Sequence, residues 1–148
     1  LSTEDKSQSV QRLAREKWKI TVAGKNLSDA QLKRLKDGKT NTYVEVGLPP
    51  GGCDIIIDTG KIQKISGLVY TPVLEGGPGH VEMYDIHLSN DGKTWGKSVA
   101  SGRFGNIVNN PVEQEVNFAP GEARFVKFSA KKGAEGARQA AVAELDLL

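Results

Sequence analysis

The sequence contains one cysteine, no long apolar run and a net charge of only +2, and each of these shortages excludes a class of protein. A single cysteine cannot form an internal disulfide, which rules out the disulfide scaffolds common among small secreted domains. Cys53 lies in an apolar run over residues 53–58, and this position predicts a small buried hydrophobic residue. No segment approaches the roughly 18 apolar residues of a membrane span, so the sequence predicts no transmembrane helix.

Groups for catalysis are also scarce. Two histidines, one cysteine and scattered acids provide no recognisable set of nucleophile, base and orienting group. Neither a glycine-rich phosphate loop nor the ligand spacing of a zinc site is present. We therefore expect no enzymatic activity of its own.

Nucleic acid is not expected as the main partner, because the few excess positive charges are interspersed with acids. One basic cluster is broken by Leu32, Leu35 and Asp37, and this pattern favours a solvated surface over a phosphate site. Its members are Lys33, Arg34, Lys36 and Lys39.

What remains is ordinary globular composition, with 38% hydrophobic and 26% charged residues in a chain of 148, which fits one domain. Residues 1–17 are polar and are interpreted as a linker or the end of a preceding domain, and residues 18–148 as the folded domain. No signal peptide is visible and the chain starts abruptly, so we expect a piece of a longer protein.

Short alternating segments separated by turn residues dominate the domain. Ser28 is predicted to cap one short helix over residues 29–36, the glycine-rich segment 71–79 to form a surface loop, and residues 90–93 to form a hairpin turn. The pattern predicts an all-β antiparallel sandwich of about eight strands. Strands are expected at residues 18–22, 42–46, 53–58, 65–70, 81–89, 96–101, 112–118, 124–129 and 141–148.

Several stretches, in this order and spacing, resemble one family. They are Asp37-Gly38 followed by Thr42, Ile56-Ile57-Asp58-Thr59-Gly60, Val69-Tyr70-Thr71-Pro72, the run Tyr84 to Trp95, Ala123 to Phe128, and Ala143-Glu144-Leu145. The set resembles the coagulation factor five/eight type C, or discoidin, domain, and above all its bacterial galactose-binding-like branch attached to glycoside hydrolases. The resemblance covers about residues 18–148 and implies a jelly-roll β-sandwich.

The resemblance also implies a structural calcium site. Its ligands would be carboxylates of Asp37 and Glu144, the hydroxyl and carbonyl of Thr42, and carbonyls of Arg34, Lys39 and Ala143. Such a set of hard oxygens suits Ca²⁺, which takes 6–8 of them. The alternative is that Asp37-Gly38 only ends the helix, while Glu144 pairs with a nearby lysine.

A sugar site on the loops at one end of the sandwich is implied as well. An aromatic ring would stack on the apolar face of the sugar, and polar side chains would bind its hydroxyl groups. The candidates are Glu75, His80, Arg103, Phe104, Asn106 and Arg138.

The chain departs from the family pattern in these loops. The loop 131–140 lacks the aromatic residue that sugar-binding members often carry, and His80 stands where many have an arginine. Phe104 is the only aromatic residue left for stacking, and the alternative of a core residue at the sandwich edge stays open.

Taken together, the sequence predicts a monomeric, non-catalytic carbohydrate-binding module that binds galactose-type or amino sugars and is appended to a glycosidase. The parent protein is expected to be bacterial and extracellular or periplasmic. The alternative is a structural spacer or protein-interaction domain with a degenerate pocket. A lipid-headgroup binder ranks last, because Val73 and Leu74 are the only apolar residues available to enter a membrane surface.

Overall fold

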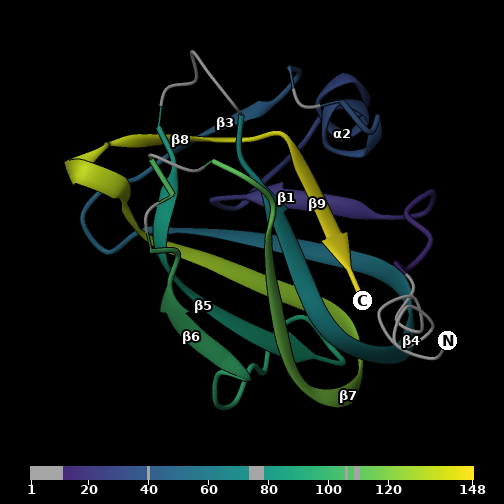
Figure 1. Ribbon diagram of the computed structural model, residues 1–148. Helices are drawn as coiled ribbons and strands as arrows, with labels where there is room; N and C mark the ends of the chain where they lie inside the picture. The colour runs from purple at the N-terminus through teal and green to yellow at the C-terminus, as the bar shows by residue number, and fades with distance from the viewer. Residues whose placement is uncertain (1–11, 40, 74–78, 106, 109–110) are drawn as a thin grey trace, which may run out of the picture.

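The computed structural model describes residues 12–39, 41–73, 79–105, 107–108 and 111–148, and in these the chain is predominantly β-structure (Figure 1). The predicted all-β antiparallel sandwich is confirmed. Its elements are β1 (Lys19–Val22), β2 (Lys25–Asn26), α2 (Asp29–Lys36), β3 (Val44–Gly47), β4 (Cys53–Thr71), β5 (Val81–Ser89), β6 (Ala100–Arg103), β7 (Gln114–Gly133), the 3₁₀ turn η1 (Ala134–Gly136), β8 (Gln139–Val142) and β9 (Glu144–Leu147).

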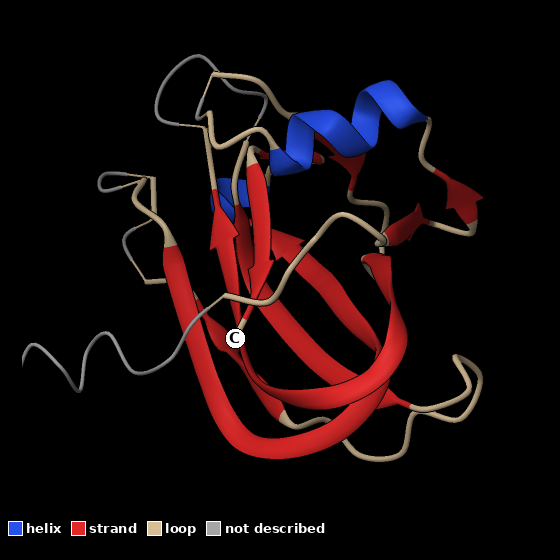
Figure 2. Ribbon diagram, turned by 90° about the vertical axis from the view of Figure 1, so that its right-hand side faces the viewer, coloured by secondary structure: helices blue, strands red, loops and turns tan. Residues whose placement is uncertain are grey.

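Two long strands, β4 and β7, connect the faces of the sandwich. They pair antiparallel along most of their length, with register shifts between Asp58 and Gln63 and between Ile65 and Gly67. Both strands curve strongly, as Figure 2 shows. One half of β4 therefore lies beside β1, while its other half lies beside β9. The main sheet has the order β2-β1-β4-β7-β5-β6, and β3 pairs with β8 in a small second sheet.

The core lies between the two faces and comes from alternate residues of these strands. In β5 the side chains of Tyr84, Ile86 and Leu88 belong to the core, as their alternation predicts, whereas Met83 is exposed. Cys53 is buried, as expected for a small apolar residue. The largest fully buried side chains include Tyr70, Phe128, Ile55, Ile57, Leu145 and Leu147.

The strand boundaries differ from the prediction in several places. Residues 53–58 and 65–70 form one strand, because Thr59-Gly60-Lys61 bends the chain without ending the pairing. The Thr59 hydroxyl donates to the carbonyls of Arg124 and Lys61, which ties the bend to β7. Residues 112–118 and 124–129 likewise merge into β7, whereas the segment 141–148 divides between β8 and β9.

The helix α2 forms where its capping residue predicts. Ser28 accepts a hydrogen bond from the backbone N–H of Gln31, and the Gln31 side chain accepts one from the Ser28 N–H, which together make a capping box. Leu35 faces the core and is 2% exposed. At eight residues, α2 is too short to cross a bilayer, and no helix in the described part of the chain is long and apolar enough to do so.

Residues 12–17, expected in the linker, contact the folded domain. The Leu13 N–H donates to the Leu147 carbonyl at 2.8 Å. Arg15 contacts Glu144 at 2.8 Å and Asp146 at 3.1 Å, and Arg12 contacts Asp146 at 2.6 Å. We call these four charged residues, Arg12, Arg15, Glu144 and Asp146, the N-terminal clamp, because they join the beginning of the described chain to its last strand.

Candidate functional site

Three segments meet at one end of the sandwich, which we call the loop end: residues 79–80, 103–104 and 131–139. The Ala134 N–H donates to the His80 carbonyl at 2.9 Å, and the Ala141 N–H donates to the Gly79 carbonyl at 3.0 Å. The η1 turn of this end lies far from the C-terminus (Figure 1). Met83 pairs with both Arg103 and Lys132, so the loop end brings the segments of His80, Arg103 and Arg138, which are distant in sequence, to the same end of the domain.

Arg103 remains accessible at the end of β6. Its guanidinium contacts the Glu82 carboxylate at 2.7 Å, and 65% of its side chain is exposed. The hydrogen bond with Glu82 raises the pKa of Arg103, so the group is a permanent cation. An exposed guanidinium has further N–H donors for a ligand beyond the one that Glu82 uses.

Phe104 takes the core position rather than the stacking position. It is 5% exposed, and its ring lies 4.5 Å from the ring of Tyr84 and 5.6 Å from that of Tyr70, measured between centroids. Because both neighbours are stacked on it, Phe104 offers no free face to a sugar. The burial of Phe104 favours the alternative, a core residue at the sandwich edge, over the predicted stacking role.

Tyr70 holds the base of the loop end together, a role that the sequence did not indicate. Its hydroxyl donates to the Ala141 carbonyl at 2.9 Å and accepts from the Val81 N–H at 3.2 Å. Burial raises the pKa of Tyr70 far above its ordinary value, so the hydroxyl stays protonated. The residue connects the end of β4 to the first residue of β5 and to β8.

A shallow cavity of about 920 Å³ opens at the loop end beside Arg138. Lys131 and Lys132 also line it, so we call it the cationic cavity. These two lysines are not among the predicted ligands, because the family pattern points to an aromatic residue in the loop 131–140 and not to its charges. The lining is formed by Gly47, Leu48, Pro49, Pro50, Gly51, Lys131, Lys132, Gly133, Gly136, Ala137, Arg138 and Gln139.

The other predicted sugar ligands differ in how exposed they are. Arg138 is exposed, and its carbonyl accepts from the Leu48 N–H at 2.7 Å. His80 is half-buried. Glu75 and Asn106 lie outside the described residues.

The residues implied for calcium lie together at a second place, between the end of α2 and β9. The Thr42 hydroxyl donates to Asp37 at 2.6 Å, and the Gly38 N–H donates to Glu144 at 2.9 Å. The Glu144 carboxylate therefore contacts the residue that follows Asp37, which makes the two carboxyl groups neighbours. Two neighbouring carboxyl groups and a hydroxyl are a donor set that fits a hard cation.

The two carboxyl groups differ in their surroundings. Burial raises the pKa of Glu144, despite the opposing contact with Arg15. For Asp37 burial also acts upward, but hydrogen bonds from Thr42 and Lys39 lower its pKa overall. Glu144 pairs with Arg15, not with a lysine as the alternative expected. The other implied ligands, Arg34, Lys39 and Ala143, would use only backbone carbonyls.

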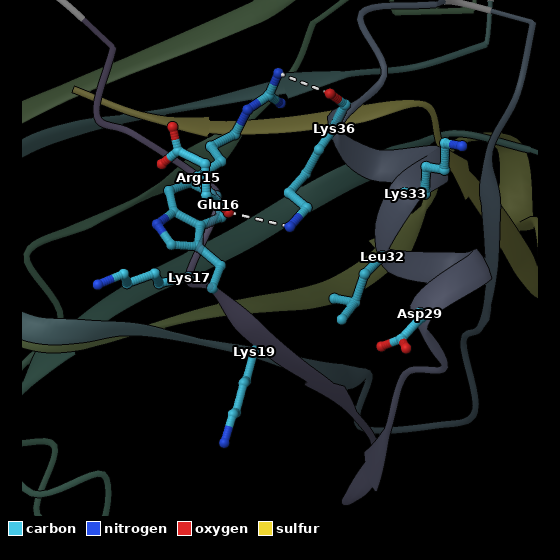
Figure 3. Close-up of a pocket in the computed structure, with 9 residues that line it drawn as sticks. Arg15, Glu16, Lys17, Lys19, Asp29, Leu32, Lys33 and Lys36 are labelled. Carbon is cyan, nitrogen blue, oxygen red and sulfur yellow. Dashed lines mark hydrogen bonds between the residues drawn. The ribbon is translucent and has the colours of Figure 1, made fainter.

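Another cavity, of about 840 Å³, lies between α2 and the segment that leads into β1 (Figure 3). Here the Lys36 amine donates to the Arg15 carbonyl at 3.0 Å. The amines of Lys17 and Lys33 point to opposite sides in Figure 3, so the charges do not converge on one ligand. None of the predicted sugar ligands within the described residues lines this cavity. Its lining is formed by Arg15, Glu16, Lys17, Trp18, Lys19, Asp29, Leu32, Lys33 and Lys36.

Comparison with known proteins identifies the family to which this domain is similar. The F5/8 type C domain matches residues 18–145. A sialidase of Micromonospora viridifaciens is 37% identical over 124 residues, which are 80% of this chain and 19% of the sialidase. A galactose oxidase of Gibberella zeae is 26% identical over 141 residues, or 91% of this chain and 20% of the oxidase. The chain thus spans about a fifth of the length of these curated relatives.

Solved structures of similar fold come from Clostridium perfringens. A family 32 carbohydrate-binding module in complex with galactose has a TM-score of 0.73 and 25% identity, with 92% of this chain and 96% of that one covered. A CBM32 module in complex with GalNAc-β-1,3-galactose has a TM-score of 0.77 and 22% identity, with 93% and 99% covered.

Proposed function

The chain belongs to the F5/8 type C domain family, and from this premise we propose that it is a non-catalytic carbohydrate-binding module. It binds galactose-type or amino sugars through its loop end. The observation that carries this proposal is that Arg103 and Arg138 are both exposed at the loop end of a sandwich of this family. Guanidinium groups donate several hydrogen bonds in a fixed geometry, which suits the oxygen atoms of a sugar.

The relatives support a role within a larger enzyme. The matched region is about a fifth of a sialidase and of a galactose oxidase, and related modules have been solved with galactose or GalNAc-β-1,3-galactose bound. We propose that the parent protein is an exported glycosidase or a similar glycan-processing enzyme, working outside the cell or in the periplasm. A module tethered to it raises the local concentration of the catalytic domain at its glycan.

We also propose a structural calcium ion at the junction of α2 and β9. Asp37 and Glu144 would supply carboxylates, Thr42 its hydroxyl and carbonyl, and Arg34, Lys39 and Ala143 carbonyl oxygens. The proximity of the two carboxyl groups supports this, since a divalent cation between them removes their repulsion. Its role would be to fix the last strand against the loop that follows α2.

The second candidate function is a spacer or protein-interaction domain that has lost its sugar pocket. The burial of Phe104 favours it, because none of the predicted ligands within the described residues offers an aromatic face for stacking. A spacer would keep the sandwich but bind no glycan at all.

A glycan array probed with the full 148-residue chain separates these functions. We expect binding to galactose-containing glycans, and a reduction of at least fivefold in the variants Arg103→Ala and Arg138→Ala. Lys97→Ala is the matched control, because Lys97 is exposed in the connection between β5 and β6, at the other end of β5. An array without any bound glycan, from protein shown to be folded by circular dichroism, would reject the module and favour the spacer.

A further inference from the structure

All charged residues that line the described part of the cationic cavity have the same sign. They are Lys131, Lys132 and Arg138. Lys131 lies 3.8 Å from Asp85, which is not part of the lining. A concave surface with one sign of charge concentrates ligands of the opposite sign.

A row of side chains extends this positive surface across three strands. Met83 of β5 is the register partner of Arg103 on β6 and of Lys132 on β7. Partners in register lie side by side, although the register of β5 with β7 shifts on both sides of the Met83–Lys132 pair, so this pair lies at an irregularity of the sheet. Arg103 and Lys132 are exposed and Met83 is 41% exposed, so a small apolar surface lies between two cations.

The cavity lacks the usual means of binding a neutral sugar. Its apolar lining consists of Leu48, Pro49, Pro50 and Ala137, and no aromatic ring is part of the described lining. Stacking on an aromatic face is therefore not available there. A ligand that binds in this cavity depends on hydrogen bonds and charge instead.

The walls of the cavity are close-packed. A Cβ atom on Gly52 would collide with the Ala130 carbonyl oxygen, and one on Gly133 would lie 2.9 Å from the Leu48 side chain. Only glycine allows these backbones to approach so closely. The backbone of residues 130–133 is thus fixed relative to the turn 47–52 before a ligand arrives, so that only the lysine side chains have to be ordered on binding.

We propose that the loop end binds an anionic sugar residue, one that carries a carboxylate or a sulfate, with Lys132 and Arg138 contacting the anionic group. The inference rests on the proposed function and deepens it by naming the class of sugar. Sugars with a free amine are disfavoured, because their ammonium group has the same charge as the cavity. The exposed row through Met83 and Arg103 would contact the neighbouring residue of the glycan.

The test is isothermal titration of the 148-residue chain with galactose, galacturonic acid and galactose 6-sulfate at 50 and 500 mM NaCl. These probes differ only in the group at carbon 6. At 50 mM NaCl we expect at least tenfold tighter binding of one or both anionic probes than of galactose, and a loss of most of this preference at 500 mM. Galacturonic acid and galactose 6-sulfate separate a carboxylate ligand from a sulfate ligand.

The variant Lys132→Ala should reduce the ratio of anionic to neutral affinity at least threefold, and Lys132→Arg should retain it. Lys97→Ala should leave the ratio as it is. If galactose binds as tightly as both anionic probes, or the ratio is unaffected by Lys132→Ala, the inference is wrong while the proposed function stands. If none of the three probes binds and the glycan array is also empty, both are wrong.

Discussion

The N-terminal clamp and the loop end use charge in opposite ways. In the clamp, Glu144 and Asp146 are 8% and 3% exposed, and both carboxylates are paired with Arg15. At the loop end, 65% of the Arg103 side chain and 45% of the Lys131 side chain are exposed. Buried charges must be paired, and removing a partner is costly, whereas exposed pairs contribute little to stability. The exposure of a charged side chain therefore indicates whether it stabilises the fold or remains available for a ligand.

The variant Arg15→Ala should have the largest effect on stability. It leaves the buried Glu144 without a guanidinium partner and Asp146 with Arg12 alone, and we expect a loss of about 3 kcal/mol in the free energy of unfolding. Urea denaturation measures this loss. Adding Glu144→Gln and Asp146→Asn to the variant should recover part of it. A loss well under 1 kcal/mol for Arg15→Ala would remove the distinction between the two regions.

Bound calcium should stabilise the side of the domain that carries the N-terminal clamp, and not the loop end. At a free concentration of 100 times its Kd, one ion bound only to the folded state adds about 2.7 kcal/mol of stability. Thermal unfolding with calcium and with a chelator measures the effect, and Asp37→Asn should reduce it. Identical unfolding curves in both conditions would exclude the proposed ion.

Tyr70→Phe tests whether the base of the loop end is held as firmly as the clamp. The substitution leaves the buried Val81 N–H and Ala141 carbonyl without their hydroxyl partner, at a cost of about 2 kcal/mol. Chemical denaturation gives the value. Tyr43→Phe is the matched control, because Tyr43 is only partly buried at the edge of a small core cluster. Equal effects of the two variants would contradict the role assigned to Tyr70.

The pH dependence of stability should reveal the clamp through Glu144. Burial raises its pKa above 4.5, so the protonated form is favoured in the folded state. The stability that this carboxyl contributes is therefore complete below pH 4.5 and is lost as the pH rises through the raised value. In chelator, the unfolding free energy of Glu144→Gln should lack this decline. Parallel curves for the two proteins between pH 4 and 7 would contradict the assignment.

Arg103→Ala should have the smallest effect on stability, because its pair with Glu82 is exposed. We expect no measurable change in the midpoint of thermal unfolding, together with weakened glycan binding. A clear destabilisation would mean that the loop end, like the clamp, depends on its ion pairs for folding.

Much of the fold could be predicted from the sequence, because local patterns determined it. Alternation in residues 81–89 indicated a strand, and Ser28 indicated the start of α2. Continuity across Thr59-Gly60-Lys61 could not be predicted, since it depends on the hydrogen bond from Thr59 to Arg124, 65 residues away.

The candidate sites were less predictable, because their contacts join distant segments. The resemblance brought Asp37, Thr42 and Glu144 together, and the structure places them in contact. Arg15 was missed, since it lies in a polar segment 129 residues before its partner Glu144. The burial of Phe104 likewise depends on Tyr70 and Tyr84, which periodicity around residue 104 does not reveal.

The hydrogen bond from Leu13 to Leu147 has a mechanical consequence. Because the beginning and end of the described chain lie side by side, tension applied across residues 12 and 148 first loads this contact, the neighbouring ion pairs and the backbone hydrogen bonds of Leu148 to Ser66 and Gly67. The β4–β7 pairing would carry no force until they separate. A domain pulled from both ends of its chain would thus yield at this contact before the β4–β7 sheet is strained.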